Sequence, residues 1–97
     1  MAHLRVAVYT VTRGTWTEVA QIAHDGMLPI FERQPGFVGY QLIDAGNSTG
    51  LSVSEWETEE EAEAAVAEAA DFVRDNLADR IQLQQNYVGD DLLSEIG

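Results

Sequence analysis

The chain has 97 residues, a net charge of −12, five arginines, no lysine and no cysteine. Nucleic acids and anionic membrane surfaces are unsuitable partners because both require a basic face, and without cysteine there are neither disulfides nor thiolate metal sites. No apolar run approaches the roughly 18 residues of a membrane-spanning helix, and a strand pattern that starts at Leu4 leaves no room for a signal peptide. We therefore expect one cytoplasmic domain over residues 1–97.

The first predicted elements are a strand and a helix. Apolar side chains alternate over residues 4–12, which is typical of a β-strand. A helix is predicted over residues 15–33 because Thr15 and Glu18 have the spacing of a capping box. In such a box the threonine side chain accepts from the N3 backbone N–H, and the glutamate reaches back to the N–H of the cap residue.

Two residues inside this predicted helix disfavour helical structure. Gly26 costs about 1 kcal/mol in a helix interior, and Pro29 costs about 3 kcal/mol. Pro29 also lacks the N–H that would bond to the carbonyl of Asp25. Because apolar residues continue at helical spacing to Phe31, we expect a kink here rather than the end of the helix.

The second half of the chain repeats this order. The remaining predicted elements are strands over residues 37–44 and 51–57 joined by a loop over 45–50, a helix over 58–79, a strand over 81–88 and a tail over 89–97. Thr58 and Glu61 form a second capping box at the start of the second helix. The order β-α-β-β-α-β predicts an α+β, ferredoxin-like fold, an antiparallel sheet with two helices on one face.

The alternation within the strands indicates that both faces of the sheet are apolar. The opposing sets are Val6 and Val8 against Ala7, Tyr9 and Val11, and Val38, Tyr40 and Leu42 against Phe37 and Ile43. Two helices cover only one face, and soluble monomers rarely expose apolar patches beyond a few hundred Å². We therefore expect a homodimer that associates through the open sheet face.

Two short motifs point to a known family. They are Pro35-Gly36-Phe37-Val38-Gly39-Tyr40 before and within the second strand, and Ser54-Glu55-Trp56-Glu57-Thr58 at the end of the third. With these motifs and its element order, nearly the whole chain resembles the antibiotic biosynthesis monooxygenase family. The resemblance implies two subunits packed through their sheets into a dimeric α/β barrel, each with a pocket between sheet and helices. Members oxidise phenolic polyketide intermediates without metal or flavin, degrade heme, or isomerise, and some have no known reaction, so membership does not fix the activity.

Two residues are candidate catalytic groups. Trp56 stands where the resemblance implies a pocket tryptophan, and an indole offers a flat apolar wall with one N–H donor. His24 lies beside the predicted kink, where a neutral imidazole could abstract a phenolic proton or position dioxygen. The alternatives are a core tryptophan packed under the second helix and a partly exposed helix histidine.

Four further residues are candidates for substrate binding. Ser52 and Ser54 share the strand face of Trp56 and could bond to a substrate oxygen. The quinone-forming branch of the family tends to carry asparagine in this strand, and this chain has none there. The hydroxyls of Tyr40 and Tyr87 could contact a ligand, although cross-strand packing is the commoner role of such residues.

Other chemistries lack the residues that they require. The sequence has no Walker loop, dinucleotide glycine fingerprint, HExxH zinc motif or G-x-S-x-G elbow. The heme-degrading branch uses an asparagine in the first strand and a histidine in the second helix, and neither is present. We therefore expect no metal and no cofactor. Arg80 and Asn86, at the last strand, could bind a carbonyl, and His3 near the terminus is expected to be unordered or exposed.

The leading interpretation is a small cofactor-independent monooxygenase that acts on a phenolic or polycyclic aromatic substrate. The alternative is a non-enzymatic dimeric ligand-binding or stress-related protein of the same fold. A third possibility is an isomerase or lyase acting on a lactone or hydroxy acid. An open pocket lined by Trp56, His24 and Tyr40 would favour the monooxygenase, whereas a narrow, filled space beneath the first helix would favour the binding protein.

Overall fold

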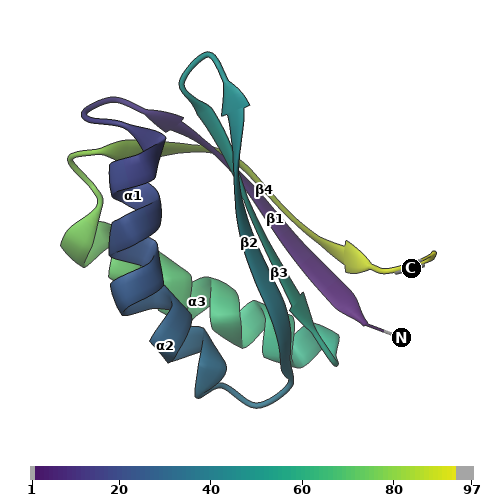
Figure 1. The fold of residues 1–97 in the computed structure, drawn as a ribbon. Helices are drawn as coiled ribbons and strands as arrows, with labels where there is room; N and C mark the ends of the chain where they lie inside the picture. Colours follow the sequence, from purple (N-terminus) through teal and green to yellow (C-terminus); the bar gives the residue numbers. More distant parts are fainter. Residues whose placement is uncertain (1, 94–97) are drawn as a thin grey trace.

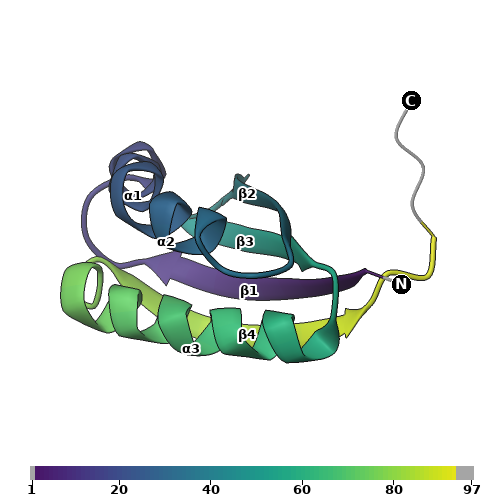
Figure 2. The ribbon, with the colours of Figure 1, turned by 90° about the horizontal axis from the view of Figure 1, so that it is seen from below.

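The computed structural model describes residues 2–93. In chain order its elements are β1 (His3–Val11), α1 (Trp16–Ile22), the π-helical turn η1 (Ala23–Met27), α2 (Leu28–Glu32), β2 (Phe37–Gly46), β3 (Thr49–Trp56), α3 (Glu59–Asn76) and β4 (Ile81–Asp90). The strands form one antiparallel sheet in the order β2-β3-β1-β4, and the helices lie together on one face (Figure 1). Figure 2 shows α3 along β1 and β4, with α1 and α2 over β2 and β3. The predicted ferredoxin-like fold is confirmed, and over the described residues the sheet is open.

Both predicted threonine caps are present. The N–H of Glu18 donates to Thr15 Oγ1, and the N–H of Glu61 donates to Thr58 Oγ1, each at 3.2 Å. The other half of the predicted box is wrong, because both glutamates have other partners. Arg80 donates to the carboxylate of Glu18 at 3.0 Å, and the hydroxyl of Thr58 donates to Glu61 at 2.9 Å. A charged donor or a hydroxyl within reach competes with the cap N–H for a carboxylate.

The expected kink in the first helix is the π-helical turn η1. The N–H of Leu28 bonds to the carbonyl of Ala23, five residues back. Pro29 follows immediately and has no N–H to continue a regular ladder. Gly26, within this turn, faces α3 so closely that a Cβ there would overlap the ring of Phe72. The two residues that disfavour a helix therefore produce a wider turn and a close approach between helices.

The hairpin between β2 and β3 is tighter than the predicted loop over 45–50. Asn47 and Ser48 have φ angles of 54° and 63°, and the strands extend to the residues on either side. Two consecutive left-handed residues are the mark of a type I′ turn, whose twist matches that of the flanking strands. The six-residue loop is thus a two-residue turn.

One face assignment in the second strand is wrong because of a β-bulge. Phe37 pairs with Trp56 and Gly39 with Glu55, so the register shifts at Val38. As a result Phe37 and Tyr40 both face the helices and pack in the core, while the side chain of Val38 is 51% exposed. Simple alternation grouped Val38 with Tyr40, and an extra residue in one strand reverses that parity.

The face of the sheet away from the helices is largely apolar, with Gln41 and Glu55 among its polar side chains. Residues directly paired across these strands include Val6 with Val53, Val8 with Leu51 and Val6 with Tyr87. A shallow depression of about 400 Å³ lies between β1, β2 and β3 on this face, lined in part by Leu4 and Val38. Within residues 2–93, no helix is long and apolar enough to cross a membrane.

Candidate functional site

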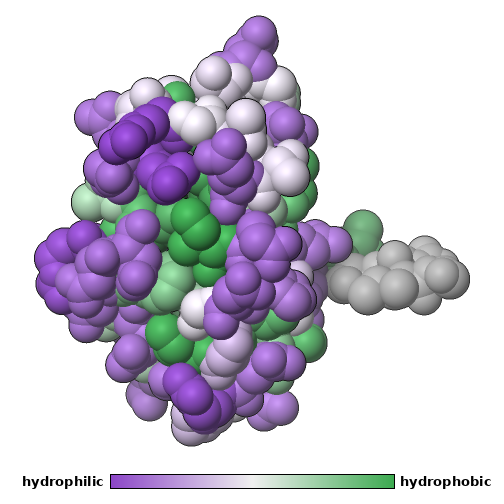
Figure 3. All heavy atoms as spheres, turned by 60° about the vertical axis from the view of Figure 1, so that its left-hand side comes forward, coloured by the Kyte–Doolittle hydropathy of each residue, from purple (hydrophilic) through white to green (hydrophobic). Residues whose placement is uncertain are grey.

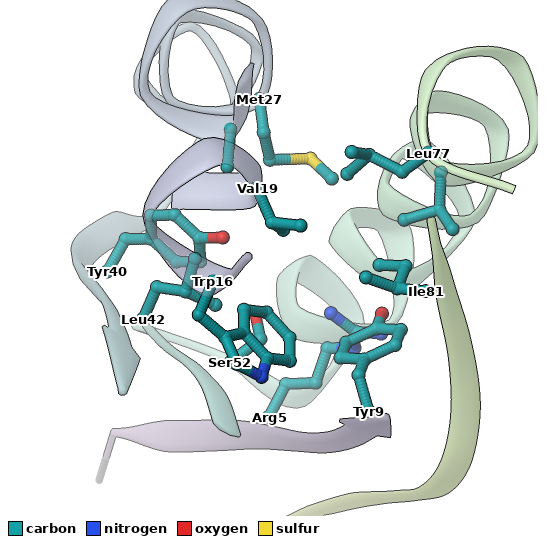
Figure 4. Close-up of a pocket in the computed structure, with 12 residues that line it drawn as sticks. Arg5, Tyr9, Trp16, Val19, Met27, Tyr40, Leu42, Ser52, Leu77 and Ile81 are labelled. Atoms are coloured by element: carbon teal, nitrogen blue, oxygen red, sulfur yellow. The ribbon is translucent and has the colours of Figure 1, made fainter. Parts of the chain in front are cut away.

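A small cavity of about 20 Å³ lies between the sheet and the helices. The residues that line it are Arg5, Tyr9, Trp16, Val19, Ala23, Met27, Tyr40, Leu42, Ser52, Val73, Leu77 and Ile81. The helices contribute apolar side chains, whereas polar groups of the strands point inward from the sheet (Figure 4). A cavity of this size holds about one water molecule. The space beneath α1 is therefore narrow.

Arg5 provides the only formal charge among the lining residues. It shares the helix-facing side of β1 with Ala7 and Tyr9, and it is 3% exposed. Its Nε donates to Oδ1 of Asn86 at 3.0 Å, and its Nη2 donates to the hydroxyl of Tyr9 at 3.4 Å. Among residues 2–93, no carboxylate lies within salt-bridge distance of it. A buried ion whose partners are all neutral carries a desolvation penalty of several kcal/mol. Arg5 is therefore suited to bind an anion.

Tyr40 and Ser52 face the same cavity from β2 and β3 (Figure 4). Burial raises the pKa of the Tyr40 phenol, the Ser52 hydroxyl lowers it in part, and Tyr9 and Arg5 act in opposite directions. Because burial has the largest effect, the phenol stays neutral over the physiological pH range. Tyr40 therefore presents a hydroxyl that either donates or accepts a hydrogen bond.

Trp16 forms an aromatic wall of the cavity. Thr15 caps α1, and this fixes Trp16 as the first residue of the helix. The indole lies against the backbone of Gly50 in β3, where a Cβ would overlap the ring. Its Nε1 is buried and has no hydrogen-bond partner within the described part of the chain. The site thus includes one N–H donor that the fold does not use.

The structure brings two of the six predicted site residues, Tyr40 and Ser52, to this cavity. Ser54 and Trp56 lie farther along the same face of β3, fully buried, and do not line it. Trp56 packs edge-on against Phe31, with ring centroids 5.4 Å apart, and Phe31 packs edge-on against Tyr40 at 5.2 Å. The contact of Trp56 with the site is therefore indirect, through Phe31.

His24 and Tyr87 lie outside the cavity. His24 is exposed on η1, with its Nδ1 3.2 Å from Oδ1 of Asp25, and it lines a separate groove of about 180 Å³ together with Leu28 and Tyr40. Tyr87 is 56% exposed and pairs with Val6, whose side chain points away from the helices. Of these two residues, only His24 shares a groove with a cavity residue.

Arg5, Tyr9 and Trp16 were not among the site residues predicted from the sequence. A signal was present for Arg5, because it has the strand parity of Ala7 and Tyr9, which places a charged side chain on a face that helices cover. Asn86, whose direction the pattern left open, holds Arg5.

The expectation that His3 is exposed was wrong. Its side chain is only 18% exposed, and its Nε2 lies 2.8 Å from Asp90, because β1 pairs with the end of β4. Among residues 2–93, no group of three or more histidine, cysteine, aspartate or glutamate side chains is arranged to hold a metal ion.

These features define a small α+β protein with an apolar cavity, polar on its sheet side, beneath a π-interrupted helix. Residues 2–70 match the family model described as antibiotic biosynthesis monooxygenase. The chain therefore belongs to this family, as the two sequence motifs predicted. A search among functionally curated proteins finds no significant match.

Solved structures share the fold at low sequence identity. SnoaB, a cofactor-independent oxygenase from Streptomyces nogalater, is 18% identical, with 96% of this chain and 95% of that chain covered and a TM-score of 0.73. A protein of unknown function from Nitrosomonas europaea is 17% identical, with 100% and 96% covered and a TM-score of 0.74. A NIPSNAP-like domain protein from Burkholderia xenovorans is 19% identical, with 98% and 90% covered and a TM-score of 0.66. At these identities the likeness establishes a shared architecture.

Proposed function

We propose that this chain is a small cofactor-independent monooxygenase that oxidises a phenolic aromatic substrate bound between the sheet and the helices. The observation that carries the proposal is the buried guanidinium of Arg5, which has only neutral partners and faces an apolar cavity together with the hydroxyls of Tyr9 and Tyr40. Membership of the family and the shared fold with the oxygenase from Streptomyces nogalater support this choice.

The arrangement suits an oxidation that begins with loss of a substrate proton. A phenolic ring beside a CH₂ group becomes electron-rich enough to reduce dioxygen once it is deprotonated. Arg5 would stabilise the anion and the hydroxyls of Tyr9 and Tyr40 would orient it, as fixed donors do at developing negative charge. In the overall reaction the CH₂ becomes a carbonyl that takes one oxygen atom of O₂. The other oxygen atom leaves as water with the two hydrogens, and the substrate supplies all four electrons.

His24 and Trp56 have different roles in this proposal. A substrate that extends from the cavity past Tyr40 reaches the groove in which His24 lies, so we assign His24 the role of proton acceptor. Trp56 is a positioning residue, since it contacts Phe31, which packs against Tyr40. Ser52 hydrogen-bonds the substrate beside Tyr40, whereas Ser54 and Tyr87 support the scaffold.

Substrate binding requires the cavity to widen, because about 20 Å³ does not admit an aromatic ring. The layer formed by α1 and η1 is the part that would move, since its regular helical ladder is already broken at η1. The narrow cavity is also the specific observation that favours a second candidate function. In that candidate, the chain is a non-enzymatic dimeric ligand-binding protein.

The proposed functional unit is a homodimer. Apolar side chains predominate on the open sheet face, and Val38 and Ile43 are exposed on it at 51% and 40%. Association of two such faces would bury this patch, which is the usual fate of large apolar surfaces.

Dioxygen uptake distinguishes the two candidate functions. With a hydroxyanthrone substrate we expect uptake of one O₂ per quinone formed, a large decrease for Arg5→Met, a smaller decrease for Trp56→Phe, and no effect of Thr17→Ala, an exposed change on α1. Saturable binding of the hydroxyanthrone without oxygen uptake would instead support the binding protein. Turnover that is unaffected by Arg5→Met would contradict the role given to the buried guanidinium.

A further inference from the structure

A second and larger groove also has Arg5 among its lining residues. It has a volume of about 350 Å³ and lies between α3 and β4. Val66, Ala70 and Leu83 are among its apolar lining residues, and Arg5 and Asn86 are among its polar ones. The volume lies in the range of about 300–1,000 Å³ that is common for small-molecule sites.

Arg5 lies between this groove and the inner cavity. Arg5, Tyr9 and Val73 line both spaces, so they separate a wide outer chamber from a narrow inner one. Figure 3 shows apolar side chains exposed between hydrophilic ones on the helical side of the molecule, which indicates that the helices leave part of the apolar layer uncovered. The polar end of a molecule seated in the outer groove would meet the guanidinium.

The charges around the groove favour an anionic ligand. Arg5 and Arg74 both line it, in a chain with a net charge of −12. Arg74 is exposed and bonds to Asp71 and Asp75 at 3.2 Å each, so its charge is compensated. Arg5 is buried, and its remaining amino group, Nη1, has no hydrogen-bond partner within residues 2–93. Of the two arginines that line the groove, Arg5 is therefore the one whose positive charge is not compensated.

We infer that the groove between α3 and β4 binds a flat apolar molecule that carries one anionic oxygen, with this oxygen paired to Arg5 and the ring system held between Ala70 and Leu83. A guanidinium pairs strongly with such an oxygen, especially where water is excluded. The inference deepens the proposed function, on which it rests for the view that this ligand is the substrate. It assigns the substrate a negative charge and a first binding position in this outer groove, from which the substrate passes Arg5 into the inner cavity, where the proposed oxidation takes place.

Binding without oxygen provides the test, with 2-naphthoate and its neutral isostere 2-naphthamide as probes in anaerobic calorimetry. We expect naphthoate to bind the wild-type chain at least about tenfold more tightly than the amide, as a charged hydrogen bond predicts. Arg5→Met should lower the affinity for naphthoate to that for the amide. Arg13→Met, which removes an exposed arginine that does not line the groove, should leave both affinities unchanged.

A second variant keeps the test decisive if Arg5→Met fails to fold. Ala70 is an exposed residue of α3 that lines the groove, so Ala70→Phe should fold and fill the space, and we expect it to weaken both probes about tenfold. Equal affinities for naphthoate and naphthamide in the wild-type chain would overturn the inference. Binding that is unaffected by Ala70→Phe would also overturn it, because the ligand would then occupy another site.

The source of the anionic oxygen is distinguished with 2-naphthol, whose absorption moves to longer wavelength on ionisation. A bound naphtholate band at neutral pH, lost in Arg5→Met, would identify an ionised phenol as the ligand. If naphthoate binds more tightly than naphthamide and bound naphthol stays un-ionised, the ligand is identified as a carboxylate. Either result supports the inference. If naphthoate binds but no phenol causes oxygen uptake, only the proposed monooxygenase activity is contradicted. If oxygen is taken up but naphthoate binds no more tightly than naphthamide, only the inference of an anionic ligand is contradicted.

Discussion

Nη2 of Arg5 lies 3.4 Å from the hydroxyl oxygen of Tyr9. On β1 the two residues face the helices on either side of Ala7. Both side chains are buried, and the phenol is a neutral acceptor that leaves the charge uncompensated. The pair therefore links a cost in stability to the capacity to bind an anion.

Arg5→Met is predicted to leave the free energy of unfolding unchanged or to raise it by about 1 kcal/mol. An apolar side chain of similar length removes the desolvation penalty of a buried ion, and such replacements are commonly neutral or stabilising. Urea denaturation of both proteins measures the difference. A loss of more than about 2 kcal/mol would show that Asn86 and Tyr9 fully compensate the buried guanidinium.

The pKa of Tyr40 predicts a loss of stability in alkali. Burial raises this pKa above the ordinary value of 10.0, so above that pH the unfolded chain has lost a proton that the folded chain retains. The free energy of unfolding contributed by Tyr40 is therefore constant below pH 10 and falls as the pH rises further. In urea titrations from about pH 9 to about pH 11, Tyr40→Phe should show a shallower decline than the wild type. Parallel curves would contradict the assignment of the shift to Tyr40.

Gly50→Ala is predicted to destabilise the protein by about 1–3 kcal/mol, because the added methyl group overlaps the indole of Trp16 and forces it from the cavity wall. Thermal unfolding measures the loss, and a shift of the tryptophan emission reports the displacement. Gly39→Ala is the matched control, since this strand glycine has open space around it and lacks a left-handed φ. Equal effects of the two changes would show that contact with Trp16 is not the cause.

The open sheet face predicts a dimer at micromolar concentration in sedimentation velocity. Val38→Glu should shift the protein towards monomer, since Val38 is exposed on this face at the β-bulge and a buried carboxylate opposes association. Ala64→Glu adds the same charge on the exposed side of α3 and should leave the dimer intact. A wild-type chain that sediments as a monomer would contradict association through the sheet.

The order and approximate bounds of the elements were predictable because they depend on local signals. Thr15 and Thr58 satisfy backbone donors within their own first turns, and the caps form wherever the helices pack. The disturbance near Gly26 and Pro29 was predictable for the same reason, since a missing N–H is a property of the proline itself. Its form as a π-turn, with the ring of Phe72 of α3 packed against Gly26, is seen only in the tertiary structure.

The bulge at Val38 was beyond the reach of simple alternation. Whether a strand carries an extra residue is settled by its pairing with the neighbouring strand, here at Phe37 with Trp56 and Gly39 with Glu55. Each side chain beyond the bulge changes face relative to those before it. Tyr40, a predicted site residue, therefore faces the cavity, and Val38 lies on the opposite surface instead of beside it.

The sequence by itself determined the ferredoxin-like order of elements, the helix caps and the family motifs, because these depend on spacing along the chain. The tertiary structure decided which polar groups meet, because Arg5, Tyr9, Tyr40 and Ser52 come from three strands whose register and bulges depend on long-range pairing. It also moved the centre of the candidate site from Trp56 to Arg5. A buried charge is recognisable only once every carboxylate that could have paired with it has been placed elsewhere.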